Sequence, residues 1–408
     1  MGTEFLKIVG VDEAKEIIEN LFRESYEMKS ENVSIANSYN RVISKNMDAI
    51  FDLPPFDKAL KDGYAMKAED SFGATEENPK ILKCVDSVKA GSFSKKTIKN
   101  GECIEISTGA PIPNGSDAVM MVEFSEKLDE SNDIAILKSV PPTEDIAKKG
   151  SDIEKGKLLL KKGTILNPMK IGLLSTQGIA DLSVFKKLIV SIISTGNEIL
   201  STNEKIEYGK IYDVNTNLIK GAVLSSGGIP IIKGIVKDDY NQLKAKIIDS
   251  LKSSDIVICS GGTSAGVGDV LRNVIEELGE VLIHGIAFKP GKPTLIGKID
   301  GKIIIGLPGN PVSAIIVYNV FIDQYIRLIS GLSEKESNKR KKFKLAKRIH
   351  SAKGRMEYLL IEIKNNEAYP ILKDSGAIAS LSYADAYIKI PKSTEIIDVG
   401  ETVEIILL

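Results

Sequence analysis

The 408-residue sequence contains no tryptophan, only two histidines and only three cysteines. The cysteines, Cys84, Cys103 and Cys259, form no Cys-x-x-Cys pair, and the histidines, His284 and His350, lie far apart in the sequence. This scarcity argues against a zinc or iron–sulfur centre and against a disulfide framework. Because each cysteine lies in an apolar, strand-like run, we expect all three to be small core residues.

An excess of one charge and a long hydrophobic run are also missing. The 54 Lys and Arg residues balance 55 Asp and Glu residues, so net charge gives no argument for a nucleic-acid or membrane partner. Apolar runs such as "LIVSII" are too short to cross a bilayer. The opening "MGTEFLKIVG" matches neither a secretory leader nor a myristoylation signal. We therefore expect a cytoplasmic protein that binds neither nucleic acid nor membrane.

The length predicts several domains, and the patterning changes along the chain. Residues 11–22 have helical spacing of apolar side chains, and residues 53–145 are rich in short apolar runs, glycine and proline, which indicates a β-rich insertion. Residues 332–408 contain short alternating strands and predict a small β-barrel or sandwich. The basic stretch 335–348 fits a solvated linker and first strand better than an RNA or membrane patch.

Residues 188–331 show a regular alternation of apolar runs and amphipathic stretches. This alternation predicts a mainly parallel sheet with helices on both faces, the doubly wound α/β architecture. The apolar runs occupy residues 188–193, 229–236, 255–260, 294–299 and 302–307.

Glycine-containing loops follow four of the apolar segments in this region. They are "STGNE", "SGGTSAGVGD", "FKPGKP" and "PGNP". Because ligands of an open parallel sheet bind outside the carboxyl ends of its strands, we expect the four loops to share one cleft. Two of the loops run into predicted helices, whose free N–H groups can hold a phosphate or another oxyanion. The candidate anion-binding residues in those two loops are Ser260, Gly261, Gly262, Ser264, Pro308, Gly309, Pro311 and Ser313.

Charged residues occupy the same predicted loops. Lys289 and Lys292 flank a Pro-Gly turn, so both can point at negative charge, while Glu198, Asp213 and Asp269 supply carboxylates. Carboxylates beside phosphate-binding loops suggest Mg²⁺, which bridges protein oxygens to substrate phosphates. The alternative for Asp213 is that it caps a helix starting near residue 215.

The N-terminal half supplies a second set of candidates. Asp62 lies in "KDGYA", Thr108 in "STGAP" and Asp152 in "KGSDI". The alternative is turn chemistry, because Asp-Gly at residues 62–63 and Pro-Asn-Gly at 113–115 are turn signals.

These stretches, in this order, resemble the MoeA family of molybdopterin molybdenumtransferases, which includes the E domain of gephyrin. The resemblance covers nearly the whole chain. The matching segments are "LPPFDKALKDGYA", "STGAPIPNGSDAVMMVE", "KGSDI", "GTIL", "IGLLSTQG", "STGNEI", "YDVNTNLI", "SGGTSAGVGD", "KPGKP", "GLPGNPVSA", "GRMEYL" and "SGAIASLSYADAYIKIP".

The resemblance implies an enzyme that inserts molybdate into adenylylated molybdopterin and releases AMP with the help of Mg²⁺. It also implies a homodimer whose active site lies between subunits, with a possible contact to molybdopterin adenylyltransferase. The implied fold has four domains. They are an elongated split domain at 1–48 and 145–187, an inserted β domain at 49–144, the doubly wound domain at 188–331 and a C-terminal β-barrel at 332–408.

Carried over by position, the resemblance gives most of the candidates a role. Asp62 and Thr108 would come from one subunit, and Glu198 and Asp269, the metal ligands, from the other. Asp213 would lie on the nucleotide and pterin side, and Asp152 would be the contribution of the first domain. The lysines would attract molybdate and phosphate, and the Pro-Gly loop at 308–311 would shape the anion pocket beside Ser313.

The sequence departs from the family pattern at four places, which are Thr263, Val267, Val270 and Ala147. Ala147 stands where the family commonly has arginine, and Lys148 or Lys149 could substitute for it. Three alternatives stay open: a tungstate-preferring enzyme of the same reaction, the adenylyltransferase that makes its substrate, and a non-catalytic scaffold like part of gephyrin.

Overall fold

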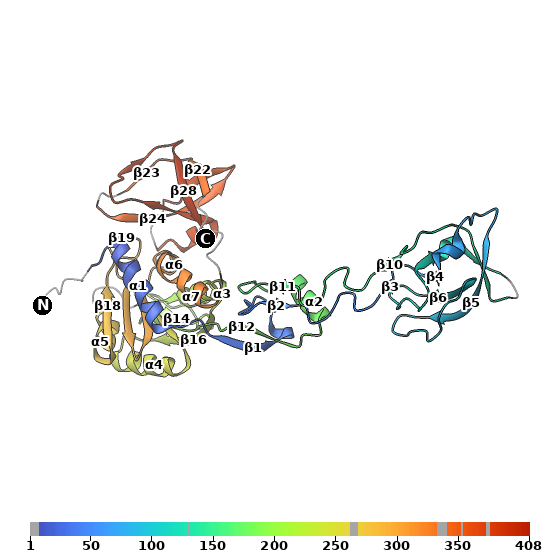
Figure 1. The fold of residues 1–408 in the computed structure, drawn as a ribbon. Coiled ribbons are helices and arrows are strands. Elements are labelled where there is room, and N and C mark those ends of the chain that lie inside the picture. The colour runs from blue at the N-terminus through green and yellow to red at the C-terminus, as the bar shows by residue number, and fades with distance from the viewer. Residues whose placement is uncertain (1–7, 129–130, 262–267, 333–340, 352–353, 373–375) are drawn as a thin grey trace, which may run out of the picture. The chain divides into compact units, whose positions relative to one another are not determined.

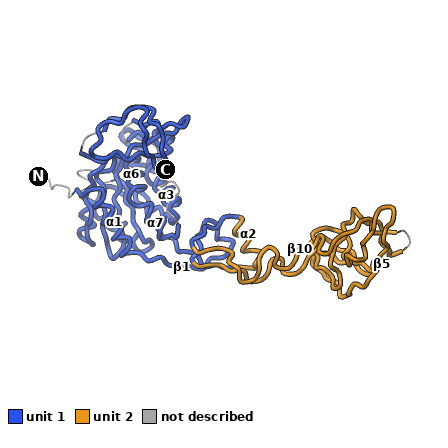
Figure 2. Tube along the Cα trace, turned by 45° about the horizontal axis from the view of Figure 1, so that its top comes forward, with its two compact units in different colours: residues 1–44, 163–168, 181–408 blue, residues 45–162, 169–180 orange. Residues whose placement is uncertain are grey.

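The computed structural model describes residues 8–128, 131–261, 268–332, 341–351, 354–372 and 376–408. The chain forms two compact units (Figure 2). The first comprises Met1–Ser44, Gly163–Pro168 and Asp181–Leu408, and the second Lys45–Lys162 and Met169–Ala180. Each unit is described by itself below.

The centre of unit 1 is a six-stranded sheet (Figure 1). Five strands point in the same direction, and β20 alone among the six runs antiparallel to its neighbours. In sheet order the strands are β16 (Ile229–Val236), β13 (Ile189–Thr195), β17 (Ile256–Ser260), β21 (Lys302–Leu307), β20 (Leu295–Ile299) and β18 (Glu280–His284). All five apolar runs of the sequence are therefore strands. The central ones read as continuous apolar runs because both of their faces are buried.

Helices cover both faces of this sheet. One core cluster joins β13, β17 and β21 to α1 (Val11–Ser25), α3 (Asn215–Ser225), α6 (Pro311–Val317) and α7 (Asp323–Ile329). A second cluster joins the same three strands to α4 (Tyr240–Ser253) and α5 (Gly268–Leu278). The predicted doubly wound α/β fold is confirmed. Helix α1, which the predicted division places in the split domain, packs into this core.

One helical stretch, Pro311–Ile329, is long and apolar enough to cross a membrane by length and composition. It consists of α6, a π-helical segment at Tyr318–Ile322 and α7. Most of the stretch is buried, and Tyr318 and Phe321 are fully enclosed by the core of unit 1. The stretch is longer than the uninterrupted apolar runs of the sequence, such as residues 188–193, because it also contains polar residues. Its composition is that of a helix buried in a large core.

The C-terminal segment is a closed barrel rather than a sandwich. Five strands pair in a ring, because β24 contacts both β25 and β26. The ring consists of β24 (Met356–Lys364), β25 (Glu367–Pro370), β22 (Lys341–Leu345), β28 (Thr402–Leu407) and β26 (Ala386–Ile390). The short strand β19 (Phe288–Lys289) pairs with β24, so the barrel is attached to the Lys-Pro-Gly-Lys loop of the doubly wound part. Two short strands, β23 (Ile349–His350) and β27 (Ile396–Ile397), pair beside it.

Several shorter strands pair as two-stranded sheets within each unit. In unit 1, β1 (Ser30–Ser34) pairs with β12 (Asp181–Phe185), and β14 (Ile199–Leu200) pairs with β15 (Ile211–Tyr212). In unit 2, β2 (Met47–Asp48) pairs with β11 (Leu158–Leu160), and β3 (Lys58–Ala59) pairs with β10 (Ile146–Ala147). Helix α2 (Pro168–Thr176) begins at the proline that the sequence predicts for the first helical position.

Unit 2 contains the predicted β-rich insertion as a six-stranded sheet. In sheet order the strands are β7 (Ala118–Met121), β4 (Gly63–Met66), β6 (Glu102–Ile106), β5 (Lys80–Val88), β9 (Asp133–Ile136) and β8 (Ser125–Lys127). Separate hydrophobic clusters pack on its two faces. The boundaries of the four-domain division stay a prediction.

Candidate functional site

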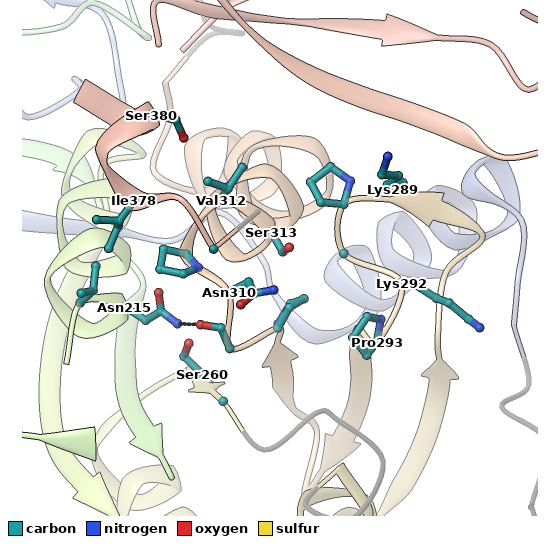
Figure 3. A pocket seen from close by; sticks show the side chains of 18 of the residues that line it. Asn215, Ser260, Lys289, Lys292, Pro293, Asn310, Val312, Ser313, Ile378 and Ser380 are labelled. Carbon is teal, nitrogen blue, oxygen red and sulfur yellow. Dashed lines mark hydrogen bonds between the residues drawn. The ribbon is translucent and has the colours of Figure 1, made fainter. Parts of the chain in front are cut away.

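Unit 1 contains a cavity of about 1170 Å³ at the carboxyl edge of the central sheet. The four glycine-containing loops all contribute to its wall, as the sequence predicts. Figure 3 shows Ser260, Lys289, Lys292 and Asn310 from three of them. The predicted site residues that line it are Glu198, Asp213, Ser260, Gly261, Lys289, Lys292, Pro308, Gly309, Pro311 and Ser313. Residues Gly262, Thr263, Ser264 and Val267 lie outside the described residues, as does the side chain of Asp269, whose backbone belongs to α5.

The base of the cavity depends on a close approach between two strand ends. Gly261 follows β17 with φ +95°, and a Cβ atom there would lie 2.2 Å from the backbone oxygen of Thr195 at the end of β13. Only glycine fits both the conformation and the space. The carbonyl of Gly309 accepts a hydrogen bond from Asn215 Nδ2 at 2.7 Å, which ties the Pro-Gly loop to the start of α3 (Figure 3).

Three buried polar atoms at this base have no hydrogen-bond partner among the described residues. They are Thr195 Oγ1, Ser260 Oγ and Asn215 Oδ1, in side chains at most 8% exposed. A buried polar atom without a partner costs free energy, so these atoms are suited to a polar ligand in the cavity. Of the three, the sequence analysis named only Ser260 as a candidate.

Carboxylates lie at the end of the cavity formed by the "STGNE" loop. The Glu198 carboxylate packs against the backbone of Gly196. A Cβ atom built on Gly196 would lie only 2.7 Å from Glu198 Oε2, so there is no room for a side chain at residue 196. Asp238 also lines the cavity, accepts a hydrogen bond from the Asn197 amide at 3.2 Å, and keeps a buried Oδ1 with no partner among the described residues. The sequence analysis missed Asp238, although it follows strand β16 at the edge where the other candidates were found.

Asp213 serves the local fold as well as lining the cavity. Its two carboxylate oxygens accept hydrogen bonds from Thr216, one from the backbone N–H at 3.0 Å and one from the hydroxyl at 2.6 Å. These bonds cap the first turn of α3, as the alternative interpretation of Asp213 expected. Both of its oxygens are thus engaged by α3.

The cationic side of the cavity is built by two domains. Lys289 forms an ion pair with Glu357 of the barrel strand β24 at 3.0 Å, and Ser351 Oγ donates to the other oxygen of Glu357 at 2.7 Å. The Glu357 side chain is 10% exposed, whereas that of Lys289 is 62% exposed. Lys292 lies on the other side of the Pro-Gly turn, and its side chain points in a different direction (Figure 3). Arg355 of "GRMEYL" adds a third cation to the wall.

The barrel contributes residues that the sequence analysis did not single out. They are His350, Arg355, Glu357 and Ser380. Two of the segments that carry them, "GRMEYL" and the terminal "SGAIASLSYADAYIKIP", contribute to the resemblance, but nothing in their spacing shows that the barrel faces the loops. The pairing of β19 with β24 makes that connection.

Three predicted site residues, Asp62, Thr108 and Asp152, lie in unit 2. Asp62 Oδ1 accepts hydrogen bonds from the Thr108 N–H at 2.6 Å and from its hydroxyl at 2.9 Å. These two bonds, the backbone bond first, lower the pKa of the exposed Asp62 carboxyl. Asp152 lies in another turn, where its N–H donates to the carbonyl of Leu53 at 3.0 Å.

Lys148 and Lys149 follow Ala147, the position where the family commonly has arginine, and both form ion pairs. Lys148 contacts Asp57 at 2.8 Å, and Lys149 contacts Asp52 at 3.4 Å. Both pairs are partly exposed. They tie the turn after Ala147 to the segment before β3.

Comparison with known proteins decides the family. The MoeA N-terminal region (domains I and II) matches residues 9–178, the probable molybdopterin-binding domain matches residues 191–328, and the MoeA C-terminal region (domain IV) matches residues 342–408. The chain belongs to the MoeA family. The resemblance found in the sequence is thereby confirmed over most of the chain.

Relatives of known name agree with this assignment to MoeA. A protein of Methanocaldococcus jannaschii named for molybdopterin biosynthesis is 35% identical over 390 residues, covering 93% of this chain and 92% of its own. A molybdopterin molybdenumtransferase of Staphylococcus aureus is 31% identical over 408 residues, covering 96% and 94%. The crystal structure of a MoeA protein from Pyrococcus horikoshii superposes with a TM-score of 0.81 at 39% identity, covering 98% and 99%.

Proposed function

We propose that this MoeA chain inserts molybdate into adenylylated molybdopterin and releases AMP. The observation that carries the proposal is the cavity that gathers the four loops, three Lys and Arg side chains and four carboxylates. Its volume of about 1170 Å³ is at the upper end of ligand sites, which suits a substrate with both a pterin and a nucleotide part.

Anionic groups of the substrates fit the cationic side of the cavity. Molybdate is a tetrahedral dianion, and Lys289, Lys292 and Arg355 can bind it with charge-assisted hydrogen bonds. Ser260 and Ser313 offer hydroxyl donors at the glycine-containing loops. The same cations stabilise the negative charge that develops on the leaving AMP.

The carboxylate end of the cavity fits Mg²⁺. Among the described residues there is no cluster of three or more His, Cys, Asp or Glu that could hold a metal. Mg²⁺, however, usually takes one or two carboxylates and completes its shell with water and substrate phosphates. Glu198 and Asp238 would hold it, and bound Mg²⁺ would neutralise phosphate charge. Oδ1 of Asp238 is buried and finds no partner in the part of the chain that the structure describes. Asp269 remains a proposed third ligand.

We further propose that the enzyme is a homodimer in which Asp62 and Thr108 of one copy complete the site of the other. The support is the resemblance, together with the position of this exposed, hydrogen-bonded pair in unit 2 and of the cavity in unit 1. A contact with the adenylyltransferase that makes the substrate stays a prediction from the same resemblance, as does a cytoplasmic location.

The test is AMP release from adenylylated molybdopterin by the purified chain, with molybdate, with tungstate and with neither. We expect AMP release that depends on the oxyanion and falls when Mg²⁺ is chelated. Faster turnover with tungstate would favour the tungstate-preferring alternative. Synthesis of the adenylylated compound from ATP without its consumption would overturn the proposal in favour of the adenylyltransferase.

A further inference from the structure

Two of the three cysteines lie opposite each other in the sheet of unit 2. Cys84 of β5 and Cys103 of β6 are direct partners in the parallel pairing of these strands. Neighbouring strands are about 4.8 Å apart, and a disulfide needs Cα atoms roughly 4.4–6.8 Å apart. The backbone therefore places the pair within disulfide range. Both cysteines are free thiols in this structure.

The side chains of the pair lie on the same face of the sheet. Cys103 is fully buried in the cluster that contains Tyr64, Met66 and Met120, and Cys84 packs against this cluster while remaining half-buried. The Cys84 thiol also contacts the Asp86 carbonyl at 3.3 Å. The Cys84 thiol can thus be reached from solvent, whereas the Cys103 thiol is buried next to it.

The two thiols differ in reactivity. The interaction with the neighbouring Cys103 thiol is the largest cause that lowers the pKa of Cys84, and the interaction with Cys84 together with burial raises the pKa of Cys103. A lowered pKa and partial exposure are the features of a thiolate that reacts with oxidants. The buried partner is then positioned to resolve the product.

We propose that Cys84 and Cys103 are a redox modification site that forms a reversible disulfide with hydroperoxides. The Cys84 thiolate attacks the peroxide oxygen, the O–O bond breaks, and hydroxide leaves as water, which gives a sulfenic acid at Cys84. Cys103 then attacks the Cys84 sulfur, the S–O bond breaks, and a second water leaves with the Cys103 proton. Two thiols are oxidised and one peroxide is reduced.

The position of the pair connects it to the Asp62–Thr108 contact. Strand β6 begins at Glu102 and ends at Ile106, two residues before Thr108, and Ile106 pairs with Gly63, which follows Asp62. A disulfide between β5 and β6 would therefore cross-link the strand that carries Thr108 to its neighbour. This inference does not depend on the proposed enzymatic reaction.

The test treats the reduced full-length chain with hydrogen peroxide, blocks the remaining thiols and maps the peptides by mass spectrometry. We expect a Cys84–Cys103 cross-linked peptide and a fall from three free thiols to one, reversed by dithiothreitol. With limiting iodoacetamide, Cys84 should be alkylated before Cys103 and Cys259.

Single serine variants provide the matched controls. Cys84→Ser and Cys103→Ser should each abolish the cross-link, whereas Cys259→Ser, which changes a buried cysteine of unit 1, should leave it intact. Wild-type protein that keeps all three thiols, or that stops at sulfinic acid on Cys84, would overturn the proposal even if a variant failed to fold.

Discussion

The residues of the cavity do more than their types suggest. Lys289 was expected to attract molybdate and phosphate, and it is also paired with Glu357, a nearly buried carboxylate from the barrel. Asp213, a candidate ligand, directs both oxygens at Thr216. Sequence reasoning could identify which residues carry charge at the loops, because the loops follow recognisable strands. It could not identify their partners, because those come from segments distant in the sequence.

Lys289→Ala should weaken oxyanion binding. The change removes one cation and leaves Glu357 without its lysine partner, so negative charge on the cavity wall rises. A charge-assisted hydrogen bond is worth about 1.5–3 kcal/mol, which predicts a rise of roughly tenfold or more in the apparent molybdate requirement. The measurement is the molybdate dependence of AMP release.

The control for this prediction is Lys389→Ala. Lys389 is an exposed lysine on β26 that does not belong to the described cavity wall. An equal effect of both variants would mean that Lys289 acts only through the net charge of the chain.

Thr108→Val should raise the pKa of Asp62 part of the way back toward its ordinary value. The variant keeps the backbone N–H donor, which is the larger cause of the lowered pKa, and loses the hydroxyl donor. A lowered pKa contributes stability that is lost as pH falls from the unfolded-state pKa through the folded-state pKa. The variant should therefore have less of this stability, and its loss should be complete at a higher pH. NMR titration of carboxyl-labelled aspartate, with Asp62→Asn used for assignment, measures the shift.

Ser94→Ala is the matched control for the titration. Ser94 Oγ donates to Asp86 at 2.6 Å and lowers the pKa of that exposed carboxyl in the same way. The Ser94→Ala variant should therefore raise the pKa of Asp86 and leave the pKa of Asp62 unchanged. If the pKa of Asp62 is the same in Thr108→Val as in the wild type, the hydrogen bond from the Thr108 hydroxyl is absent in solution.

At the scale of elements, the site is made by strand ends that converge. The apolar runs predicted the strands of the central sheet, and the rule for open parallel sheets predicted that their loops would meet. The same rule, applied to β16, would have found Asp238. The close approach of Gly261 to Thr195 was not predictable, because it depends on how two neighbouring strand ends turn.

Gly261→Ala should destabilise unit 1. The residue has φ +95°, and its Cβ would overlap the Thr195 carbonyl at 2.2 Å, so the end of β17 must move away from β13. A strained backbone position of this kind costs about 1–3 kcal/mol. The urea midpoint of unfolding, followed by circular dichroism, measures the loss.

Gly309→Ala is the control within the same cavity. A Cβ at Gly309 would come no closer than 3.7 Å to another atom, so the urea midpoint should stay at the wild-type value. Equal destabilisation by both variants would show that crowding at Gly261 is not the cause.

At the scale of the whole molecule, the proposed site residues divide between two compact units. Unit 1 holds the cavity, and unit 2 holds Asp62, Thr108 and Asp152. In the proposed homodimer, a site needs unit 1 of one copy and unit 2 of the other. A mixed dimer then retains one complete site when each copy is defective in a different unit.

Mixing inactive Asp62→Asn and Glu198→Gln chains should therefore restore activity. Random exchange makes half of the dimers mixed, and each has one intact site, so about a quarter of wild-type AMP release should return. Mixing Glu198→Gln with Lys289→Ala, both in unit 1, should add nothing to the activity that the Lys289→Ala chains retain by themselves. Absence of recovery in the first mixture would show that each site is built from one chain.

The sequence by itself determined five of the six strands of the central sheet, the doubly wound class and the loops that line the cavity. It could do so because burial on two faces and glycine-rich turns leave local patterns. The tertiary structure alone decided the order in which the barrel strands pair, the pairing of Lys289 with Glu357 and the facing of Cys84 with Cys103. Those contacts join residues far apart in the chain, and strand pairing, rather than local sequence, sets which residues meet.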